Sequence, residues 1–297
     1  MGIIDTARFI MRHPLNRERK TAALIHWLRW QLGSRLLFGW PVAVPFANGA
    51  SLLAKPGMTG ATGNIYCGLH EFEDMAFVLH FLRPNDLFAD IGANIGSYTI
   101  LACTTGARCI SFEPVPATYE KFLDNLNLNR SSEQVDARNE AVGQNAGWIE
   151  MITDQDTTNQ ALKSGEKYAG ETERVPVTAL DKVLQGKIPK LIKIDVECFE
   201  TEVLAGANQT LMHPQLQAVI MELNGSGVRY GYDENALHLS MLEAGFRSCQ
   251  YKPMERKIVD LHGNRPETGN TLYIRDLETA RNTVKTASRQ RVVGIDL

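Results

Sequence analysis

The chain of 297 residues is 44% hydrophobic and 22% charged, with a formal net charge of −3, a composition typical of a globular protein with one large core. This charge balance provides no overall field to attract nucleic acid, so we expect no nucleic-acid partner. No stretch approaches the roughly 18 apolar residues of a membrane span. The five cysteines include no C-x-x-C pair, which argues against a disulfide framework or a zinc cluster and favours a reducing cytoplasm.

The first predicted element is an amphipathic helix over residues 17–33 that ends at Gly33. Two interpretations are open. The helix packs on the protein's own core, which we favour, or it contacts a membrane surface or a partner with Trp27 and Trp30 at the interface, which would make the protein membrane-peripheral. The apolar face and the nearby basic residues are Leu24, Ile25, Leu28, Leu32, Arg17, Arg19, Lys20 and Arg29.

Residues 36–66 combine short β-type runs with two stretches, "WPVAVP" and "KPGMTGATGN", whose glycine and proline content predicts turns. We expect a small α+β accessory region over residues 1–66. The main domain is expected over residues 67–280, starting with the helix "EFEDMAFVLHFL", which "RPND" ends. The polar residues 281–297 are predicted to form a peripheral helix or a loose tail.

Strand-like and helix-like segments alternate through the main domain. Such alternation predicts an α/β fold with a doubly wound, mostly parallel sheet covered by helices on both faces. The predicted strands are "LFADIG", "ARCISFEP", "VDARNEAV", "KLIKIDVE", "LQAVIMELN", "FRSCQYK" and "NTLYIR". The predicted helices are residues 97–103, "PATYEKFLDNLNLN" and "CFETEVLAGANQTL".

The turn after the first of these strands reads G-x-N-x-G and follows Asp90. In an open α/β sheet the ligand binds beyond the carboxyl ends of the strands, and glycines let the backbone approach it closely. A dinucleotide turn is G-x-G-x-x-G instead. Asp90 would repel a pyrophosphate but attract an ammonium or sulfonium group, and Glu113, at the end of the next strand, can accept hydrogen bonds from both hydroxyls of a ribose. This pattern predicts an S-adenosylmethionine site formed by Asp90, Gly92, Asn94, Gly96 and Glu113.

Six blocks of sequence resemble the FkbM-type S-adenosylmethionine-dependent methyltransferases. They run in the family's order from about residue 64 to residue 275, and no single block is specific by itself. The resemblance implies a Rossmann-like class I methyltransferase fold and methyl transfer to a hydroxyl of a sugar, a glycan or a natural product. The blocks are "DLFADIGANIGSYTILA", "ISFEPVPATYEKFLDNLNLN", "NEAVG", "VPVTALD", "KIDVECFETEVLAGA" and "IMELNGSG".

The resemblance also implies roles for single residues. Glu140 and Ala141, in "NEAVG", match the region that borders the adenine, and Glu71 lies in a shared segment that could cover the cofactor. The block "KIDVECFE" matches the fourth-strand motif, but Cys198 stands where members usually have glycine. This departure leaves open how closely backbone or substrate can approach at that position.

Three carboxylates are candidates for the general base that removes the proton of an acceptor hydroxyl. Asp195 and Glu197 follow the fourth strand, whose carboxyl end faces the same crevice as the glycine turn, and Asp195 could instead bind the cofactor's ammonium group. Glu222 closes the next apolar strand, where an unpaired carboxylate is costly to bury. It is either a substrate or base residue or the partner of a cation such as Lys193. No metal is expected, because no fixed-spacing ligand motif is present.

The acceptor is predicted to be a small molecule or a glycan. Polar side chains in two loops favour a sugar hydroxyl, namely Asn159, Asn224, Ser226 and Tyr230. The alternatives are a nicotinamide-dependent oxidoreductase on a related sheet and a non-catalytic cofactor-binding module. The G-x-N-x-G spacing disfavours the first, and the presence of Asp90, Glu113 and Asp195 disfavours the second.

Overall fold

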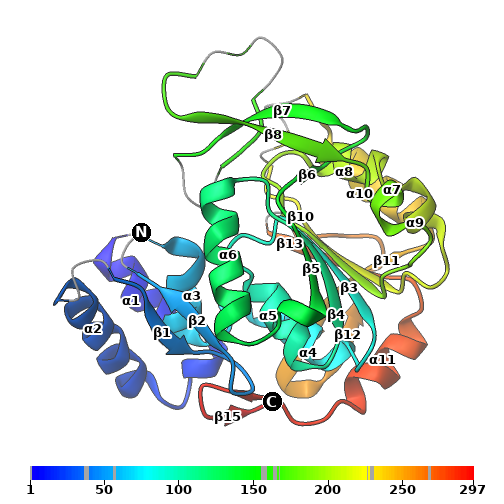
Figure 1. Cartoon of the computed structure of the whole chain (residues 1–297). Helices are drawn as coiled ribbons and strands as arrows, with labels where there is room; N and C mark the ends of the chain where they lie inside the picture. Colours follow the sequence, from blue (N-terminus) through cyan, green and yellow to red (C-terminus); the bar gives the residue numbers. More distant parts are fainter. Residues whose placement is uncertain are drawn as a thin grey trace.

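The computed structural model describes residues 2–36, 40–55, 58–154, 159–162, 166, 168–225, 227, 231–266 and 269–297. Its centre is an eight-stranded sheet (Figure 1). The five strands from β10 to β5 are parallel, whereas β13, β11 and β12 pair antiparallel. The predicted mostly parallel α/β sheet is therefore confirmed. The strand order is β12 (Lys257–Asp260), β11 (Arg247–Lys252), β13 (Asn270–Ile274), β10 (Ala218–Glu222), β9 (Leu191–Ile194), β3 (Leu87–Ile91), β4 (Arg108–Phe112) and β5 (Val135–Arg138).

Successive residues of the central strands pack against two different helical layers, as the alternation of side chains along a strand requires. Phe88 and Leu191 belong to the core on one face, and Ala89 and Ile192 to the core on the other. The first face is covered by α4 (Phe72–Phe81), α5 (Ser97–Thr104), α6 (Pro116–Leu128) and α11 (Leu277–Lys285). The second is covered by α7 (Leu180–Leu184), α8 (Glu200–Ala205), α9 (Asn208–Met212) and α10 (Glu234–Glu243).

The predicted single helix "CFETEVLAGANQTL" is in fact the two short helices α8 and α9. Gly206 lies at the break, and an ideal Cβ there would be 2.1 Å from the carbonyl oxygen of Gly143. Close approach of a distant segment therefore bends the chain where local periodicity predicted a continuous helix.

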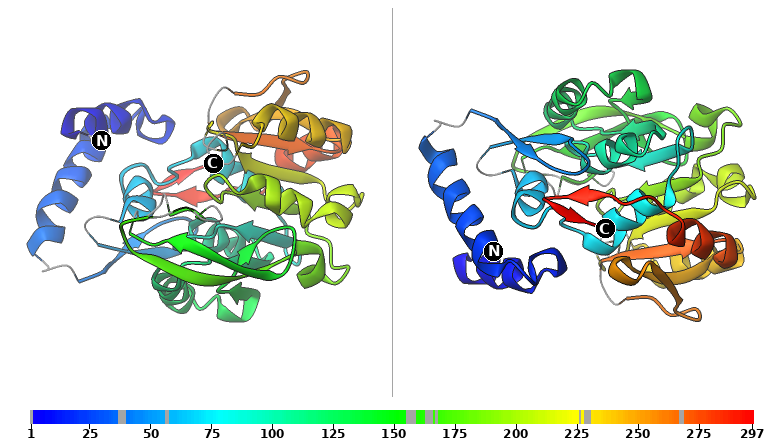
Figure 2. Two further views of the ribbon diagram at one scale, coloured as in Figure 1. Left: turned by 90° about the horizontal axis from the view of Figure 1, so that it is seen from above. Right: turned by 90° about the horizontal axis from the view of Figure 1, so that it is seen from below.

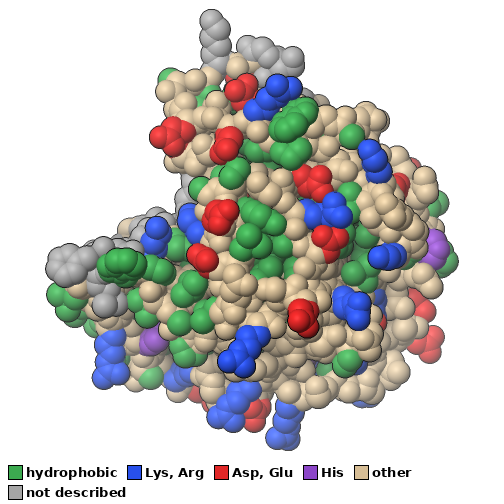
Figure 3. All heavy atoms as spheres, in the orientation of Figure 1, with side chains coloured by type: hydrophobic (Ala, Val, Ile, Leu, Met, Phe, Trp, Pro, Cys, Tyr) green, Lys and Arg blue, Asp and Glu red, His purple; other side chains and the backbone are tan. Residues whose placement is uncertain are grey.

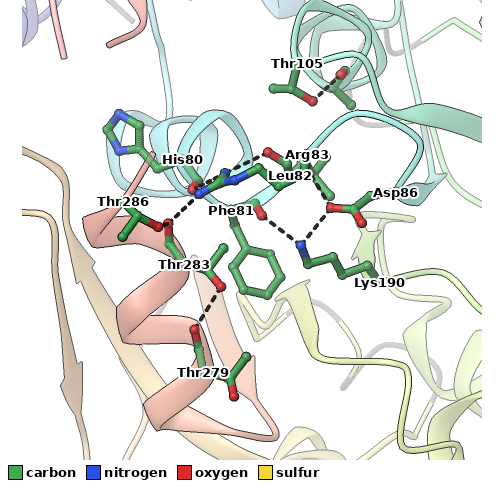
Figure 4. Close-up of polar contacts among 11 residues, drawn as sticks. His80, Phe81, Leu82, Arg83, Asp86, Thr105, Lys190, Thr279, Thr283 and Thr286 are labelled. Atoms are coloured by element: carbon green, nitrogen blue, oxygen red, sulfur yellow. Dashed lines mark hydrogen bonds and ion pairs between the residues drawn. The ribbon is translucent and has the colours of Figure 1, made fainter. Parts of the chain in front are cut away.

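The edge of the sheet at the amino ends of the parallel strands is joined by polar contacts (Figure 4). Lys190 donates to the Phe81 carbonyl at 3.2 Å and to Asp86 Oδ2 at 2.7 Å. Asp86 also accepts the backbone N–H of Arg83, whose guanidinium donates to the carbonyl of Thr283 in α11. We call this group the amino-edge network; it connects α4, β3, β9 and α11.

A second, three-stranded sheet lies over the opposite edge (Figure 1). Its strands β7 and β8, like β12 of the central sheet, were not predicted from the sequence. Strands β7 and β8 pair with each other in antiparallel orientation over six residues each. Their hydrogen bonds join segments that are separate in the sequence and stabilise strands that show little apolar alternation. The order is β6 (Ala141–Val142), β8 (Thr172–Thr178) and β7 (Gly147–Ile152).

The N-terminal region stands at one side of the sheet (Figure 2). Two predictions for it are wrong. The helix does not end at Gly33, and the stretches predicted as turns contain β1 and α3. In α3 an ideal Cβ on Gly63 would lie 2.4 Å from the His70 ring, so tight tertiary packing outweighs the low helix propensity of glycine. The elements are α1 (Ile3–Arg12), α2 (Lys20–Leu36), β1 (Val42–Pro45), β2 (Ser51–Ala54) and α3 (Thr59–Cys67).

Helix α2 buries a different face from the one that its leucines predicted. Ala23 and Trp27 are buried, whereas Ile25, Leu28 and Leu32 are exposed. The helix does pack on the protein's own core, but through Ala23 and Trp27 rather than through these exposed residues, and Trp27 does not lie at an outer interface. Within the described residues, no helix has both the length and the apolarity to cross a bilayer.

The C-terminal residues fold back onto the body of the protein. After α11, β14 (Arg291–Val292) and β15 (Ile295–Asp296) form a hairpin. Val292 is fully buried and bridges Ala47 in the β1–β2 loop. These residues do not form a loose tail, and α11 runs across the predicted limit at residue 280. The division into accessory region, main domain and tail stays a prediction.

Candidate active site

A cavity of about 280 Å³ opens at the carboxyl ends of β3, β4, β9 and β10. The strand order reverses between β3 and β9, the place where open α/β sheets bind ligands. Apolar residues of β7, Ile149 and Met151, complete the wall on the side of the small sheet. The predicted site residues on its lining are Glu71, Gly92, Asn94, Glu113, Glu140, Ala141, Asp195, Glu197 and Glu222. Asp90 and Gly96 are not part of this lining.

The two glycines of the G-x-N-x-G turn make room for the protein's own chain. Gly92 has φ +86°, and an ideal Cβ there would lie 1.8 Å from the carbonyl oxygen of Asp195. Gly96 has φ +87° and its Cβ would meet the ring of Phe122 at 2.4 Å. The turn after β3 therefore packs against the loop after β9 and against α6, which accounts for both glycines without a ligand.

Glu113 holds this turn in place. Its carboxylate accepts the backbone N–H groups of Asn94 and Val115, each at 2.9 Å. Asn94 adopts a left-handed conformation with φ +52°, which asparagine tolerates better than most residues. Burial raises the pKa of Glu113 to about 7, although the two backbone donors lower it. Each carboxylate oxygen can accept a further hydrogen bond, and Glu113 lines the cavity.

Asp90 lies behind the cavity wall in a buried polar row across the sheet. It neighbours Ser111 on β4 and Lys193 on β9. Thr99 in α5 donates to Asp90 Oδ2 at 2.6 Å and lies 2.8 Å from the Ser111 hydroxyl. Burial raises the pKa of Asp90, while the charge of Lys193 opposes the rise. The charge of Asp90 thus stabilises the protonated form of Lys193.

Lys193 is the buried cation of the site. Its side chain is 3% exposed, and its Nζ lies 2.7 Å from Asp195 Oδ2 and 4.6 Å from the centre of the Tyr98 ring. Burial favours the neutral amine, but Asp195, Glu71 and Asp90 together raise the pKa of Lys193 above its ordinary value. Lys193 therefore stays charged in the folded protein.

Asp195 and Glu222 form a hydrogen-bonded pair of carboxyl groups with opposite pKa shifts. Burial alone would raise the pKa of Asp195, but Lys193 and the hydrogen bond with Glu222 lower it. Burial and then the charge of Asp195 raise the pKa of Glu222 well above its usual range. The contact with Lys193 therefore favours the ionised form of Asp195 and the shared proton on Glu222.

Glu197 and Cys198 follow in the loop after β9, both in the left-handed region, with φ +48° and +77°. This conformation costs a non-glycine residue roughly 1 to 2 kcal/mol, and such strain concentrates at functional sites. Cys198 is buried, and its backbone explains why glycine suits this position. Burial and the charge of Asp195 raise the pKa of Glu197 to about 7.

A second set of side chains, of which the sequence predicted only Glu71, braces the cavity from the α4 side. Glu71 accepts hydrogen bonds from the Tyr98 hydroxyl at 2.9 Å and from Asn270 Nδ2 at 2.8 Å. Asn270 also donates to Asp74 at 3.1 Å and pairs with Glu222 across β10 and β13. The sequence did mark the central cation, because Lys193 interrupts the apolar run "LIKI" and, by strand alternation, faces the same side as Asp195.

Three carboxylates lie close enough to hold a cation. One oxygen each from Asp195, Glu197 and Glu222 lies within 4.8 Å of the other two. The neighbouring Lys193 and the proton on Glu222 already compensate much of their charge, so the expectation of no metal stays a prediction. Of the loop residues expected near an acceptor, Asn159 lines the cavity and Asn224 does not. Ser226 and Tyr230 lie outside the described residues.

Similarity to known proteins indicates a family for this chain. The family described as "Methyltransferase FkbM domain" matches residues 90–252. The hexuronic acid methyltransferase AglP of Haloferax volcanii is 26% identical over 156 residues, which is 52% of this chain and 62% of that protein. The chain therefore spans less than two thirds of this relative's length. The methyltransferase sdnD of Sordaria araneosa is 23% identical over 192 residues, 53% of this chain and 74% of that protein.

Among solved structures, the C-terminal domain of precorrin-6Y C5,15-methyltransferase from Rhodobacter capsulatus is 13% identical, with a TM-score of 0.37, and the match covers 67% of this chain and 84% of that one. A SAM-dependent methyltransferase from Agrobacterium tumefaciens is 8% identical, with a TM-score of 0.41 and coverage of 79% and 70%. The family match covers more than half of the chain and includes the glycine turn, Glu113 and the carboxylates after β9. The chain belongs to the FkbM methyltransferase family.

Proposed function

We propose that the protein is an S-adenosylmethionine-dependent O-methyltransferase that acts on a hydroxyl group of a sugar or glycan. Family membership supports methyl transfer, and the relative from Haloferax volcanii carries a hexuronic acid in its name. The observation that carries the proposal is the cluster of Asp195, Glu197 and Glu222 around Lys193, because it supplies three carboxyl groups with different pKa shifts on one cavity wall.

The residues of the cavity fit S-adenosylmethionine chemically. When bound, this cofactor supplies an activated methyl group on a sulfonium centre. Glu113 would accept hydrogen bonds from its ribose with the lone pairs that Asn94 and Val115 leave free. The apolar Val115 and Ala141 line the part of the cavity assigned to adenine. The negative charge of Asp195 suits a cationic ligand.

Glu197 is the residue best matched to the role of general base. A base works best when its pKa lies near the working pH, and the pKa of Glu197 is raised to about 7. Asp195 is a weaker base because Lys193 and Glu222 stabilise its ionised form. Glu222 is a poorer candidate, because its raised pKa favours the protonated form. In this assignment Glu197 takes the hydroxyl proton, and Asp195 orients the acceptor or binds the cofactor's ammonium group.

The experiment is single-turnover methyl transfer with oligosaccharides that contain hexuronic acids, followed by mass spectrometry for the gain of one methyl group. Glu197→Gln keeps the shape of the side chain and should lower the rate by roughly 10² to 10⁴. The matched control is Glu200→Gln. Glu200 also has a pKa raised to about 7, by burial, but it does not line the cavity. Equal rates for Glu197→Gln and the wild type would exclude Glu197 as the base.

Cofactor binding is tested separately by calorimetry. Glu113→Ala should weaken the binding of S-adenosylmethionine by about 1 to 3 kcal/mol, the cost of losing hydrogen bonds to a buried ligand. Glu113→Gln serves as the companion variant, since it retains one acceptor oxygen for the turn. If Glu113→Ala binds as tightly as the wild type, the ribose assignment is wrong. If the wild type itself does not bind S-adenosylmethionine, the function proposed for the cavity is wrong.

A further inference from the structure

The outer face of α2 carries a continuous apolar stripe. Ile25, Leu28, Leu32 and Leu36 recur at intervals of three or four residues, the spacing of one helical face, and are 49%, 50%, 66% and 76% exposed. Trp40, shortly after the helix, is 74% exposed. Scattered exposed leucines are common, but an aligned set on one helix face indicates a surface that binds another protein or a membrane.

The inner face of the same helix is firmly anchored, so the stripe cannot turn inward. Trp27 packs in a buried cluster with Ile10 of α1 and Cys67 of α3. Gln31 Nε2 donates to the Tyr66 hydroxyl at 2.8 Å. The structure therefore fixes which face of α2 points outward.

The segment that carries the stripe is rich in positive charge. Residues 2–36 contain seven basic and two acidic residues, a net charge of +5, although the whole chain has −3. Figure 3 shows basic and hydrophobic side chains next to each other over the part of the surface that α1 and α2 occupy in Figure 1. The rest of the chain is correspondingly acidic, so this end of the molecule is a distinct cationic surface.

A groove of about 520 Å³ runs between α2 and α3 beside the stripe. Its lining combines Arg19, His26 and Arg29 with Ile25 and Ile65. Burial lowers the pKa of His26, and the charges of Arg19 and Arg29 lower it further. The groove thus has a positive potential next to an apolar surface, which suits a ligand with an anionic head and an apolar tail.

We propose that α1 and α2 form a docking surface for an anionic lipid bilayer, with the α2 stripe inserted at the interface and the basic residues on lipid phosphates. A helix with an apolar stripe and basic flanks is the usual form of an interfacial helix. A second copy of the chain is disfavoured, because a two-fold interface would place this cationic surface against itself. The surface lies apart from the methyl-transfer cavity and does not depend on the function proposed for it.

The experiment is flotation of the full chain with vesicles of phosphatidylcholine alone and of phosphatidylcholine mixed with phosphatidylglycerol. We expect binding to the anionic vesicles at low salt and release at high salt. Leu28→Ser/Leu32→Ser should lower the partition coefficient at least about tenfold, through loss of buried apolar area. Arg29→Ser should lower it about fivefold. Leu239→Ser is the matched control, since Leu239 is 56% exposed on α10 and should bind like the wild type.

Three results would overturn the proposal. The wild-type chain could remain unbound with anionic vesicles at low salt. The double serine variant could float as well as the wild type while keeping the same melting temperature. Sedimentation could also reveal a dimer without lipid that the double variant loses, with no vesicle binding, which would assign the stripe to a second copy.

Discussion

Two lysine–aspartate pairs lie at opposite ends of β9 with the same separation of 2.7 Å. Lys190 and Asp86, in the amino-edge network, are 17% and 24% exposed, and Lys193 and Asp195, on the cavity wall, are 3% and 29% exposed. The first lysine also binds a main-chain carbonyl and joins secondary-structure elements. The second lies among buried carboxyl groups and lowers the pKa values of Asp195, Glu197 and Glu222.

The difference shows that distance alone does not determine what an ion pair contributes. A partly hydrated pair contributes little, because water screens both charges. A buried lysine instead acts strongly on every carboxylate around it, and its removal leaves those charges uncompensated. The amino edge of the sheet is therefore expected to tolerate change and the carboxyl edge to resist it.

The largest contrast is expected for glycines at the two edges. In Gly92→Ala the new methyl group overlaps the backbone oxygen of Asp195, and we expect a loss of at least about 5 kcal/mol of stability. Gly106, at the amino edge, has a similar φ of +84°, but its Cβ would lie 3.2 Å from Pro84. Gly106→Ala should cost only about 1 to 2 kcal/mol. Urea unfolding measures both, and equal losses would contradict the contrast.

The lysines give the next contrast. Lys193→Met should cost about 3 to 5 kcal/mol by leaving buried carboxylates unpaired, and Lys190→Met about 1 kcal/mol or less. Without Lys193 the pKa of Asp195 rises, so the native state gains affinity for protons. The loss of stability should therefore shrink as pH falls from 8 to 5, which thermal melts at both pH values can measure. A loss that is independent of pH would mean that Lys193 acts by packing alone.

The pH dependence should separate activity from stability. Turnover is expected to fall about tenfold per pH unit below about 7, where Glu197 becomes protonated, and Glu197→Gln should lack this inflection. Burial raises the pKa values of Asp74, Glu113, Glu197 and Glu200 to about 7. Between their unfolded values near 4 and pH 7 the native state holds more protons than the unfolded state. Their contribution to stability is therefore present at low pH and is lost as pH rises through about 7.

The smallest effect is expected from a chelator. Lys193 and the proton on Glu222 already compensate the charge of the carboxylate cluster, so treatment with EDTA should leave turnover unchanged. Atomic absorption on the purified protein provides the control. Loss of activity that Mg²⁺ restores would show instead that Asp195, Glu197 and Glu222 hold a cation.

Prediction from sequence worked best where a local pattern has one structural outcome. The alternation of strands and helices predicted the sheet, and the ends of its strands brought Glu113, Asp195 and Glu222 to one cavity. Gly92 has a structural reason that the prediction did not give, because the carbonyl of Asp195 lies where a side chain would be. The local sequence does not reveal that contact, because more than a hundred residues separate Gly92 from Asp195.

The sequence by itself determined the parallel sheet, the tight turn after β3 and the set of carboxylates at its edge, because strand periodicity and glycine positions are local properties of the chain. Only the tertiary structure decided which face of α2 is buried and which carboxyl group keeps a proton. Trp27 and Leu28 are both apolar, and the choice between them depends on α1 and α3. The protonation of Asp195 and Glu222 likewise depends on Lys193 and on burial, which arise only when separate segments pack together.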